Sequence, residues 1–353
     1  MKFRYKNLKF YIRVSKLKSI VVGLVRFGVI GLGDFGERHV QALKSISGVE
    51  VVAVCSRTRS RAEEVARMYG VKKWYTDREK LVRDSEVDAV TIATADDDHV
   101  EPTILAAEAG KPALLEKPMA TTLEDADKII SAVKRSGIIF MVGHILRFDK
   151  RYRLVYYMAR EGRLGRIGSM YARRIGRQRA ASIFLNRVSA PVQTGVHDID
   201  IIRWIAGREV VQVSGFAARR MNYKYPDIFW TVMRFDDGSL GVVENGFMLS
   251  DSYPHFIDSQ LEVISEKATV QILTPGEYFS VYSVEGVDKP DVTYWPKMDT
   301  HAEGALRDEL EYFARCVAEG RTPEVIPIED ARRALEIAIM AMRSAESGVP
   351  VTI

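Results

Sequence analysis

The sequence predicts an α/β fold in which a doubly wound parallel sheet of the Rossmann type is followed by an α+β domain with a large, mostly antiparallel sheet. Three observations predict it. From residue 27, short apolar runs alternate with amphipathic stretches, and a glycine-rich turn follows the first run. Beyond residue 149 the runs are longer and alternate in polarity. Continuous apolar runs between helices are typical of buried parallel strands. Runs in which apolar and polar residues alternate are typical of antiparallel strands.

Length and composition indicate two soluble domains. A chain of 353 residues exceeds what one hydrophobic core usually supports. No apolar run approaches the roughly 20 residues of a membrane-spanning helix, so we expect no membrane contact. Cys55 and Cys316 lie in different expected elements, without metal-ligand spacing. We therefore expect a cytoplasmic protein with no bound metal.

The positive charge is concentrated at the N-terminus. The net charge is +4, but residues 1–26 contain eight Lys or Arg and no acid, which leaves 43 basic against 47 acidic residues. This balance argues against a nucleic-acid-binding surface on the folded part. The apolar stretch at 20–25 is shorter than a secretion signal usually has. We expect residues 1–26 to be a disordered basic extension.

The first domain is expected over residues 27–148. Its helices are expected at 38–45, 60–69, 99–109 and 123–136. Its strands are expected at 27–31, 49–55, 87–93, 113–116 and 138–142. Strands that alternate with helices in this way form a parallel sheet with right-handed crossovers.

The second domain is expected over residues 149–353. A helix at 150–161 precedes expected antiparallel strands at 169–175, 210–217, 229–235, 239–247 and 260–264. Asp236-Asp237-Gly238 indicates a hairpin turn, because glycine tolerates the positive φ that such turns need. Two closing helices are predicted by apolar stripes at helical spacing, namely Leu306, Leu310, Phe313 and Val317, then Ala331, Leu335, Ala338 and Met342.

The glycine-rich turn predicts a dinucleotide-binding site. It follows a strand and begins a helix, which allows a tight turn and brings bare backbone against a pyrophosphate. The alternative is a glycine turn without a ligand. The expected cofactor contacts at this turn are Gly31, Gly33, Asp34, Phe35 and Gly36.

The end of the next strand bears on the choice of nucleotide. An acidic residue there would bind the adenosine ribose and repel a 2′-phosphate, but the chain has Ser56 and Arg57, with Arg59 and Arg61 nearby. A hydroxyl and a guanidinium suit the phosphate of NADP. We expect NADP to be preferred and NAD to remain possible, although these arginines would equally suit a solvated helix start.

Several later segments resemble one family of oxidoreductases. Glu116-Lys117-Pro118 follows the fourth expected parallel strand, Gly143-His144 precedes Arg147-Phe148, and Gly195-Val196-His197 precedes Asp198-Ile199-Asp200. With the glycine turn, these segments stand where the Gfo/Idh/MocA family has them, a family that includes glucose-fructose oxidoreductase and inositol dehydrogenase. The resemblance covers about residues 27 to 353.

The resemblance implies an enzyme that transfers a hydride between a nicotinamide and a secondary alcohol or ketone of a sugar, inositol or polyol. It implies further cofactor contacts from Thr94, His99, Glu116 and Lys117. The alcohol proton must also leave, and the resemblance makes Lys117 and His197 the catalytic candidates. Burial beside a cationic nicotinamide would lower the pKa of Lys117, and Asp200 would steady His197 from the same helical face. The alternatives are a surface lysine and a buried structural histidine.

The chain departs from the family pattern at two places. Gln193 stands where an aspartate is common, and an amide can bind a hydroxyl but cannot take a proton, which favours Lys117 for proton transfer. Ala95 and Asp96 stand where a Pro-Asn pair is common. The substrate-binding candidates are Arg147, Gln193 and His197.

Other functions and an oligomer follow from the same resemblance. A cofactor-binding regulator without turnover has the same fold, as do reductases of dihydrodiols, biliverdin or keto-sugars. The family typically pairs its antiparallel sheets, so we expect a homodimer or homotetramer through that sheet. The expected partner is otherwise a small sugar or polyol.

Overall fold

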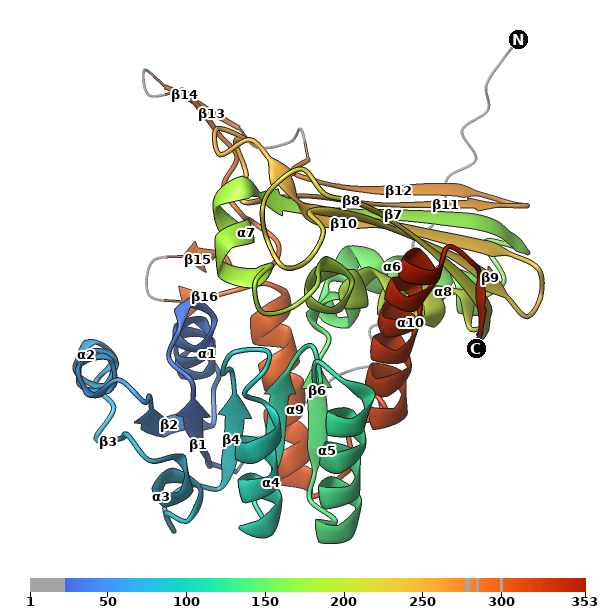
Figure 1. The fold of residues 1–353 in the computed structure, drawn as a ribbon. Coiled ribbons are helices and arrows are strands. Elements are labelled where there is room, and N and C mark those ends of the chain that lie inside the picture. The colour runs from blue at the N-terminus through green and yellow to red at the C-terminus, as the bar shows by residue number, and fades with distance from the viewer. Residues whose placement is uncertain (1–22, 277–279, 284–285, 299–300) are drawn as a thin grey trace, which may run out of the picture.

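Two sheets with helices between them organise the chain (Figure 1). The computed structural model describes residues 23–276, 280–283, 286–298 and 301–353. Residues 1–22 of the expected N-terminal extension lie outside the described residues. The first strand begins at Val25, two residues before the expected position, and Arg26 within it forms an ion pair with Asp88 at 2.8 Å.

The first sheet is parallel and doubly wound, as predicted, with strand order β3-β2-β1-β4-β5-β6. Its third strand was not predicted, because three half-buried residues, Lys-Trp-Tyr, form no apolar run. The strands are β1 (Val25–Ile30), β2 (Val49–Cys55), β3 (Lys73–Tyr75), β4 (Ala89–Ile92), β5 (Ala113–Glu116) and β6 (Phe140–Gly143).

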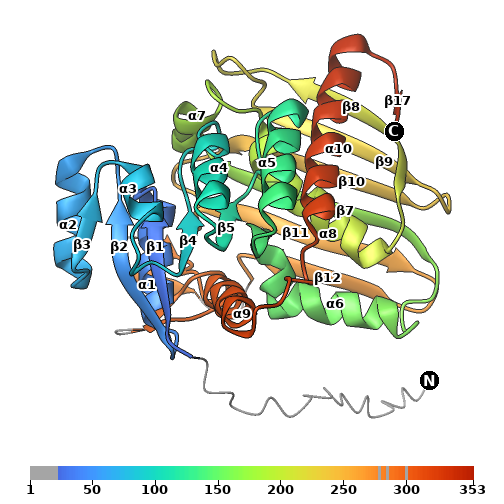
Figure 2. The same cartoon turned by 90° about the horizontal axis from the view of Figure 1, so that it is seen from below.

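Helices cover both faces of this sheet. In Figure 2, α4 and α5 lie on one side of the strands and α9 on the other. The short helix α3 was not predicted, and α1 begins four residues before the expected helix. The helices are α1 (Asp34–Lys44), α2 (Arg59–Tyr69), α3 (Arg78–Val82), α4 (Val100–Glu108), α5 (Leu123–Ser136) and α9 (Ala305–Glu319).

Helix α9 completes the first layer from the far end of the chain. Its buried face packs on α1 and β1, with the rings of Phe27 and Phe313 6.2 Å apart. Leu306 and Leu310 are fully buried there, as the apolar stripe predicts. The Rossmann layer therefore includes residues from beyond the expected division at residue 148.

The second sheet has seven strands in the order β12-β11-β7-β10-β9-β8-β17, with β7 and β10 parallel and the other pairs antiparallel. Gly238, at φ 85°, turns the chain between β9 and β10, as predicted. The strands are β7 (Ile167–Arg177), β8 (Val210–Ala218), β9 (Ile228–Phe235), β10 (Leu240–Leu249), β11 (Ile257–Ser265), β12 (Thr269–Thr274) and β17 (Val351–Thr352).

Helices cover one face of the second sheet. Helices α6 (Lys150–Arg160), α8 (Val196–Ala206) and α10 (Ile328–Ser347) lie between the two sheets in Figure 1. Helix α7 (Gln178–Phe184) follows β7, and two short hairpins, β13 (Val281–Ser283) with β14 (Gly286–Asp288) and β15 (Lys297–Met298) with β16 (His301–Ala302), follow β12. Within the described residues no helix covers the opposite face.

That opposite face of the second sheet carries exposed apolar side chains. Phe216 is 62% exposed and pairs across the strands with Trp230, which is 38% exposed. Leu240, Ile264 and Leu273 are also exposed, and the strand register places them on the same face. We call this set of five residues the outer sheet face.

Neither a membrane-spanning helix nor a cluster that could hold a metal is present among the described residues. No helix there is long and apolar enough to cross a bilayer. No group of three or more His, Cys, Asp or Glu residues there is placed to bind a metal ion. Cys55 and Cys316 are both buried and unpaired.

Two glycines of the turn after β1 should respond differently to a methyl group. A Cβ on Gly36 would lie 1.8 Å from the carbonyl oxygen of Gly31, whereas one on Gly33 would meet nothing within 4 Å. We expect Gly36→Ala to lower the free energy of unfolding by about 3 kcal/mol, and Gly33→Ala, at the helix N-cap, by less than about 1 kcal/mol. Urea unfolding of both variants tests this, and equal losses would contradict it.

Candidate active site

The glycine-rich turn leaves bare backbone at the start of α1. Gly31 needs a positive φ of 91°, and a Cβ there would lie 2.5 Å from the carbonyl oxygen of Ala93. Packing within the chain therefore accounts for Gly31 and Gly36. It does not account for Gly33, the exposed N-cap of α1, whose side-chain position is open and which supplies no side-chain cap.

An open N-terminus of this kind suits a phosphate group. The first N–H groups of a helix have no partner within the helix, and the helix dipole is positive there. Gly33 keeps the approach to these groups free of side chains. Asp34 is exposed beside it, and Phe35 packs on Trp295 with ring centroids 5.4 Å apart. The residues present therefore fit a dinucleotide pyrophosphate.

At the end of β2, where the adenosine ribose of the nucleotide is expected, one of three arginines has no ion-pair partner among the described residues. Arg59 pairs with Glu63 at 2.9 Å, and Arg61 pairs with Glu37 and with Glu64. Arg57 is exposed and forms no ion pair or hydrogen bond with any described residue. Ser56 is half-buried and its hydroxyl accepts a hydrogen bond from the backbone of Thr58 at 3.2 Å.

The carboxyl ends of β4 and β5 hold the other expected cofactor residues. The Thr94 hydroxyl donates to the carbonyl of Asp98 at 2.6 Å, and the buried ring of His99 contacts the carbonyl oxygen of Pro118 at 2.8 Å through Nδ1. Burial lowers the pKa of His99. Glu116 is buried against Nε2 of His39 at 3.0 Å. These contacts fix the segment that carries Lys117.

Lys117 lies where the two domains meet. Its Nζ donates a hydrogen bond to the backbone carbonyl oxygen of Gln193 in the second domain, at 3.0 Å. Burial lowers the pKa of Lys117, Asp96 and Glu116 partly oppose this shift, and Arg174 adds to it. A lysine with a lowered pKa is a better proton acceptor near neutral pH than an exposed one.

His197 and Gln193 face the same region from the second domain. Gln193 lies in a π-helical turn, Pro191–Gly195, which leads directly into α8 and His197. Burial lowers the pKa of His197 well below its usual value, and the charges of Lys117 and Arg174 lower it further. His197 is therefore a neutral imidazole. Its Nδ1 is buried without a partner among the described residues.

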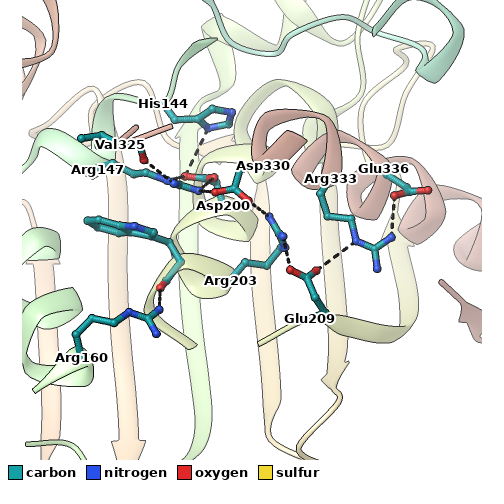
Figure 3. A network of polar contacts seen from close by, with 11 residues as sticks. His144, Arg147, Arg160, Asp200, Arg203, Glu209, Val325, Asp330, Arg333 and Glu336 are labelled. Atoms are coloured by element: carbon teal, nitrogen blue, oxygen red, sulfur yellow. Dashed lines mark hydrogen bonds and ion pairs between the residues drawn. The ribbon is translucent and has the colours of Figure 1, made fainter. Parts of the chain in front are cut away.

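The carboxylate expected to steady His197 is engaged elsewhere. Asp200 accepts hydrogen bonds from Arg147 Nε at 2.8 Å and Nη2 at 2.6 Å, and lies 3.8 Å from Nδ1 of His144 (Figure 3). The expected pairing of His197 with Asp200 is therefore wrong. Residues three apart on a helix can be neighbours, but here the buried guanidinium of Arg147 binds the Asp200 carboxylate instead.

Arg147 is buried in a network of polar contacts. Its side chain is 1% exposed, and it also contacts Asp330 at 2.9 Å and the carbonyl of Val325 at 2.7 Å (Figure 3). The network continues at the surface through Arg203, Glu209, Arg333 and Glu336. These contacts hold the Arg147 guanidinium between α8 and α10 and engage four of its five N–H donors within the chain.

Two arginines near the site were not predicted from the sequence. Arg174, buried on β7, forms a two-point ion pair with Asp198 at 2.8 and 2.9 Å. Arg187 pairs with Asp96 at 2.7 Å. The sequence could have indicated Arg174, because it shares a strand face with the apolar residues Met170 and Ala172. A charged side chain on a buried face requires an ion-pair partner. Nothing in the sequence pairs Arg187 with Asp96.

Comparison with known proteins identifies the family. A sequence model described as an oxidoreductase family with an NAD-binding Rossmann fold matches residues 25–144, and one for the C-terminal α/β domain of the same family matches residues 158–353. A scyllo-inositol 2-dehydrogenase (NAD(+)) of Bacillus subtilis is 33% identical over 93% of this chain and 96% of that protein. A myo-inositol 2-dehydrogenase of Thermotoga maritima is 29% identical over 91% and 96%.

A solved structure agrees with the sequence relatives. The crystal structure of a myo-inositol 2-dehydrogenase from Lactobacillus plantarum superposes with a TM-score of 0.82 at 27% identity, over 94% of this chain and 99% of that one. The family is the same for both sequence models and is consistent with the two relatives and the solved fold. These comparisons confirm the resemblance seen in the sequence. The chain belongs to the Gfo/Idh/MocA family of oxidoreductases, and its first domain is the NAD-binding Rossmann fold of that family.

Proposed function

We propose that this protein oxidises a secondary alcohol of inositol or a related polyol, with NAD or NADP as the hydride acceptor. The observation that carries the proposal is the meeting of Lys117, Gln193 and His197 between the two domains, at the carboxyl ends of parallel strands where ligands of such sheets bind. The names of the relatives, inositol 2-dehydrogenases, support inositol as the substrate class.

In the proposed reaction the chain supplies the proton acceptor and the substrate contacts. A bound oxidised nicotinamide supplies the hydride acceptor. Lys117, as a neutral amine, takes the proton of the reacting hydroxyl, and its lowered pKa makes the neutral form available nearer to neutral pH. The carbonyl of Gln193 accepts one N–H of Lys117 and so fixes the direction of the amine.

Neutral polar groups complete the substrate contacts. The side-chain amide of Gln193 forms no hydrogen bond with a described residue, so it has both a donor and an acceptor for hydroxyl groups. His197 is held neutral by burial and by nearby positive charge, and its Nε2 can accept a hydrogen bond from a hydroxyl. Polyols, which carry several neutral hydroxyls, match this set.

Lys117→Ala tests the proposed role. We expect kcat for oxidation of myo-inositol or scyllo-inositol to fall about 10²- to 10⁴-fold, because a positioned proton acceptor typically contributes that much. Cofactor affinity should change far less, because Lys117 is one of many contacts. Reduction of NAD and NADP followed at 340 nm measures turnover, and quenching of protein fluorescence measures cofactor binding.

The matched control is Lys111→Ala, a lysine after α4 whose Nζ contacts the backbone of Asp84 and Val87. It should keep the turnover of the parent. Equal turnover in Lys117→Ala and the parent would remove Lys117 from the reaction. If both nucleotides bind to the parent but no polyol, aldose or keto-sugar is turned over, the protein is a cofactor-binding regulator and the proposed function is wrong.

For the nucleotide, we propose that Arg57 binds the 2′-phosphate of NADP and makes NADP the preferred cofactor. The support is that Arg57 is the arginine at this end that has no partner in the described part of the chain, whereas Arg59 and Arg61 are already paired. No carboxylate stands at the end of β2 to repel the phosphate. NAD still binds, because its ribose hydroxyls can use Ser56.

Arg57→Asp should invert this preference. We expect the ratio of kcat/KM for NADP to that for NAD to fall about tenfold or more, because a charge-assisted hydrogen bond is replaced by repulsion. Arg59→Asp is the matched control, since Arg59 is held by Glu63 and lies over the ring of Trp74. An unchanged ratio in Arg57→Asp would reject this assignment.

For assembly, we propose a homodimer or homotetramer that buries the outer sheet face. Phe216, Trp230 and Leu240 are exposed apolar side chains on a face of the seven-stranded sheet that no described helix covers, and exposed apolar surface is typical of protein interfaces. In a two-fold symmetric dimer, this face would pack against the same face of the second copy.

A charge in the outer sheet face should disrupt that oligomer. We expect the Trp230→Glu variant to elute as a monomer in size-exclusion chromatography with light scattering, since an unpaired charge would be buried at the interface. Met68→Glu, which charges an exposed apolar position on α2, is the control and should elute with the parent. A monomeric parent would show that the proposed interface is wrong.

A further inference from the structure

One short segment of the second domain contacts two strand ends of the first. We call residues 187–193, between α7 and α8, the bridging segment. At one end, Arg187 Nη2 lies 2.7 Å from a carboxylate oxygen of Asp96. At the other end, the carbonyl of Gln193 accepts the hydrogen bond from Lys117 Nζ at 3.0 Å. Asp96 follows β4 and Lys117 follows β5, and these strands are neighbours in the sheet.

The carboxylate of the Asp96–Arg187 ion pair is shielded from water, and its guanidinium is partly exposed. The Asp96 side chain is 9% exposed and that of Arg187 is 31% exposed. A shielded pair interacts more strongly than a pair on the open surface. The next residue, Asp97, is 51% exposed and lies 3.5 Å from Arg187 Nε. Asp96 is therefore the residue that ties the bridging segment to the first domain at this point.

We propose that Asp96 and Arg187 are positioning residues for the reaction proposed above. Their ion pair holds the bridging segment against Lys117, and the balance of their two charges determines how readily Lys117 loses its proton. The inference rests on the proposed role of Lys117. Beyond that role, the inference assigns the Asp96 carboxylate as a negative charge that favours the ammonium form of Lys117, and the Arg187 guanidinium as a positive charge that weakens this effect. Neither residue is among those proposed to contact the substrate.

The charges around Lys117 come from several elements. Burial lowers its pKa, and Asp96 is the largest influence that raises it. Glu116 also raises it but is engaged with His39. Arg174 on β7 lowers it. The rings of His144 and His197 also face Lys117, whose charge lowers the pKa of both, and burial keeps both rings neutral.

This arrangement predicts opposite effects for the two partners. Asp96→Asn removes the carboxylate that favours the ammonium form, so Lys117 should lose its proton at a lower pH than in the parent. Arg187→Met leaves the Asp96 carboxylate without its guanidinium, so Lys117 should lose its proton at a higher pH. A purely structural ion pair would give the same effect for both variants, because either substitution breaks the same contact.

The experiment measures the proton on Lys117 without turnover. The full-length protein is labelled with a trace of acetic anhydride at a series of pH values, and mass spectrometry of the Lys117 peptide gives the labelling rate, which follows the neutral amine. We expect the midpoint to shift to lower pH in Asp96→Asn and to higher pH in Arg187→Met. The rise of kcat/KM for inositol oxidation with pH should shift in the same directions.

Two further variants serve as controls. Asp97→Asn should keep the midpoint of the parent, and the double variant Asp96→Asn/Arg187→Met should return toward it, because both charges are gone. Shifts in one direction for both single variants, or no shift in either, would overturn the inference. Absence of turnover in the parent would instead overturn the proposed function, and the labelling experiment would still decide whether the ion pair controls Lys117.

Discussion

A buried ion pair between Arg147 and Asp200 determines how the two domains of this chain meet. Arg147 follows the last strand of the parallel sheet, and Asp200 lies on α8, the helix that carries His197. Both side chains are 1% exposed, so neither charge has water as an alternative partner. Removal of Arg147 would leave the buried Asp200 carboxylate without its guanidinium partner, which costs about 3 to 5 kcal/mol. The pair therefore joins α8, the helix that carries His197, to the segment that follows β6.

The same site keeps several other charges out of water, and their partners determine which groups stay ionised. Burial alone would raise the pKa of Asp200, but the guanidinium of Arg147 lowers it, so Asp200 stays a carboxylate. Arg174 and Asp198 neutralise one another. His144, His197 and Lys117 have no carboxylate within hydrogen-bonding distance among the described residues, and burial lowers the pKa of all three. The site therefore separates fixed charges from groups that can exchange a proton.

The sequence was sufficient to predict that the first sheet is parallel, that a strand, a turn and a helix surround Gly31, and that two helices close the chain, because each depends on a local period or a local turn. Boundaries of β2, β5 and α5 were predicted to the residue. Strand β3 and helix α3 were not found, because three and five residues give no periodicity. The sequence also did not show which charged side chains far apart in the chain pair with one another. Asp200 has both His197 and Arg147 within reach, and only the packed structure shows which of them it binds.

Helix α9 has a consequence for how the protein is made. Its residues, Ala305–Glu319, supply one layer over β1 and α1, although the strands that they cover are complete by residue 143. While the ribosome is still translating the second sheet, the nascent first domain exposes Phe27 and neighbouring apolar side chains that α9 will later bury. Contacts between residues so far apart in the sequence form slowly, and until they form the apolar surface is exposed to other chains. The apolar side chains around Phe27 are therefore covered by α9 only after residues 305–319 have been synthesised.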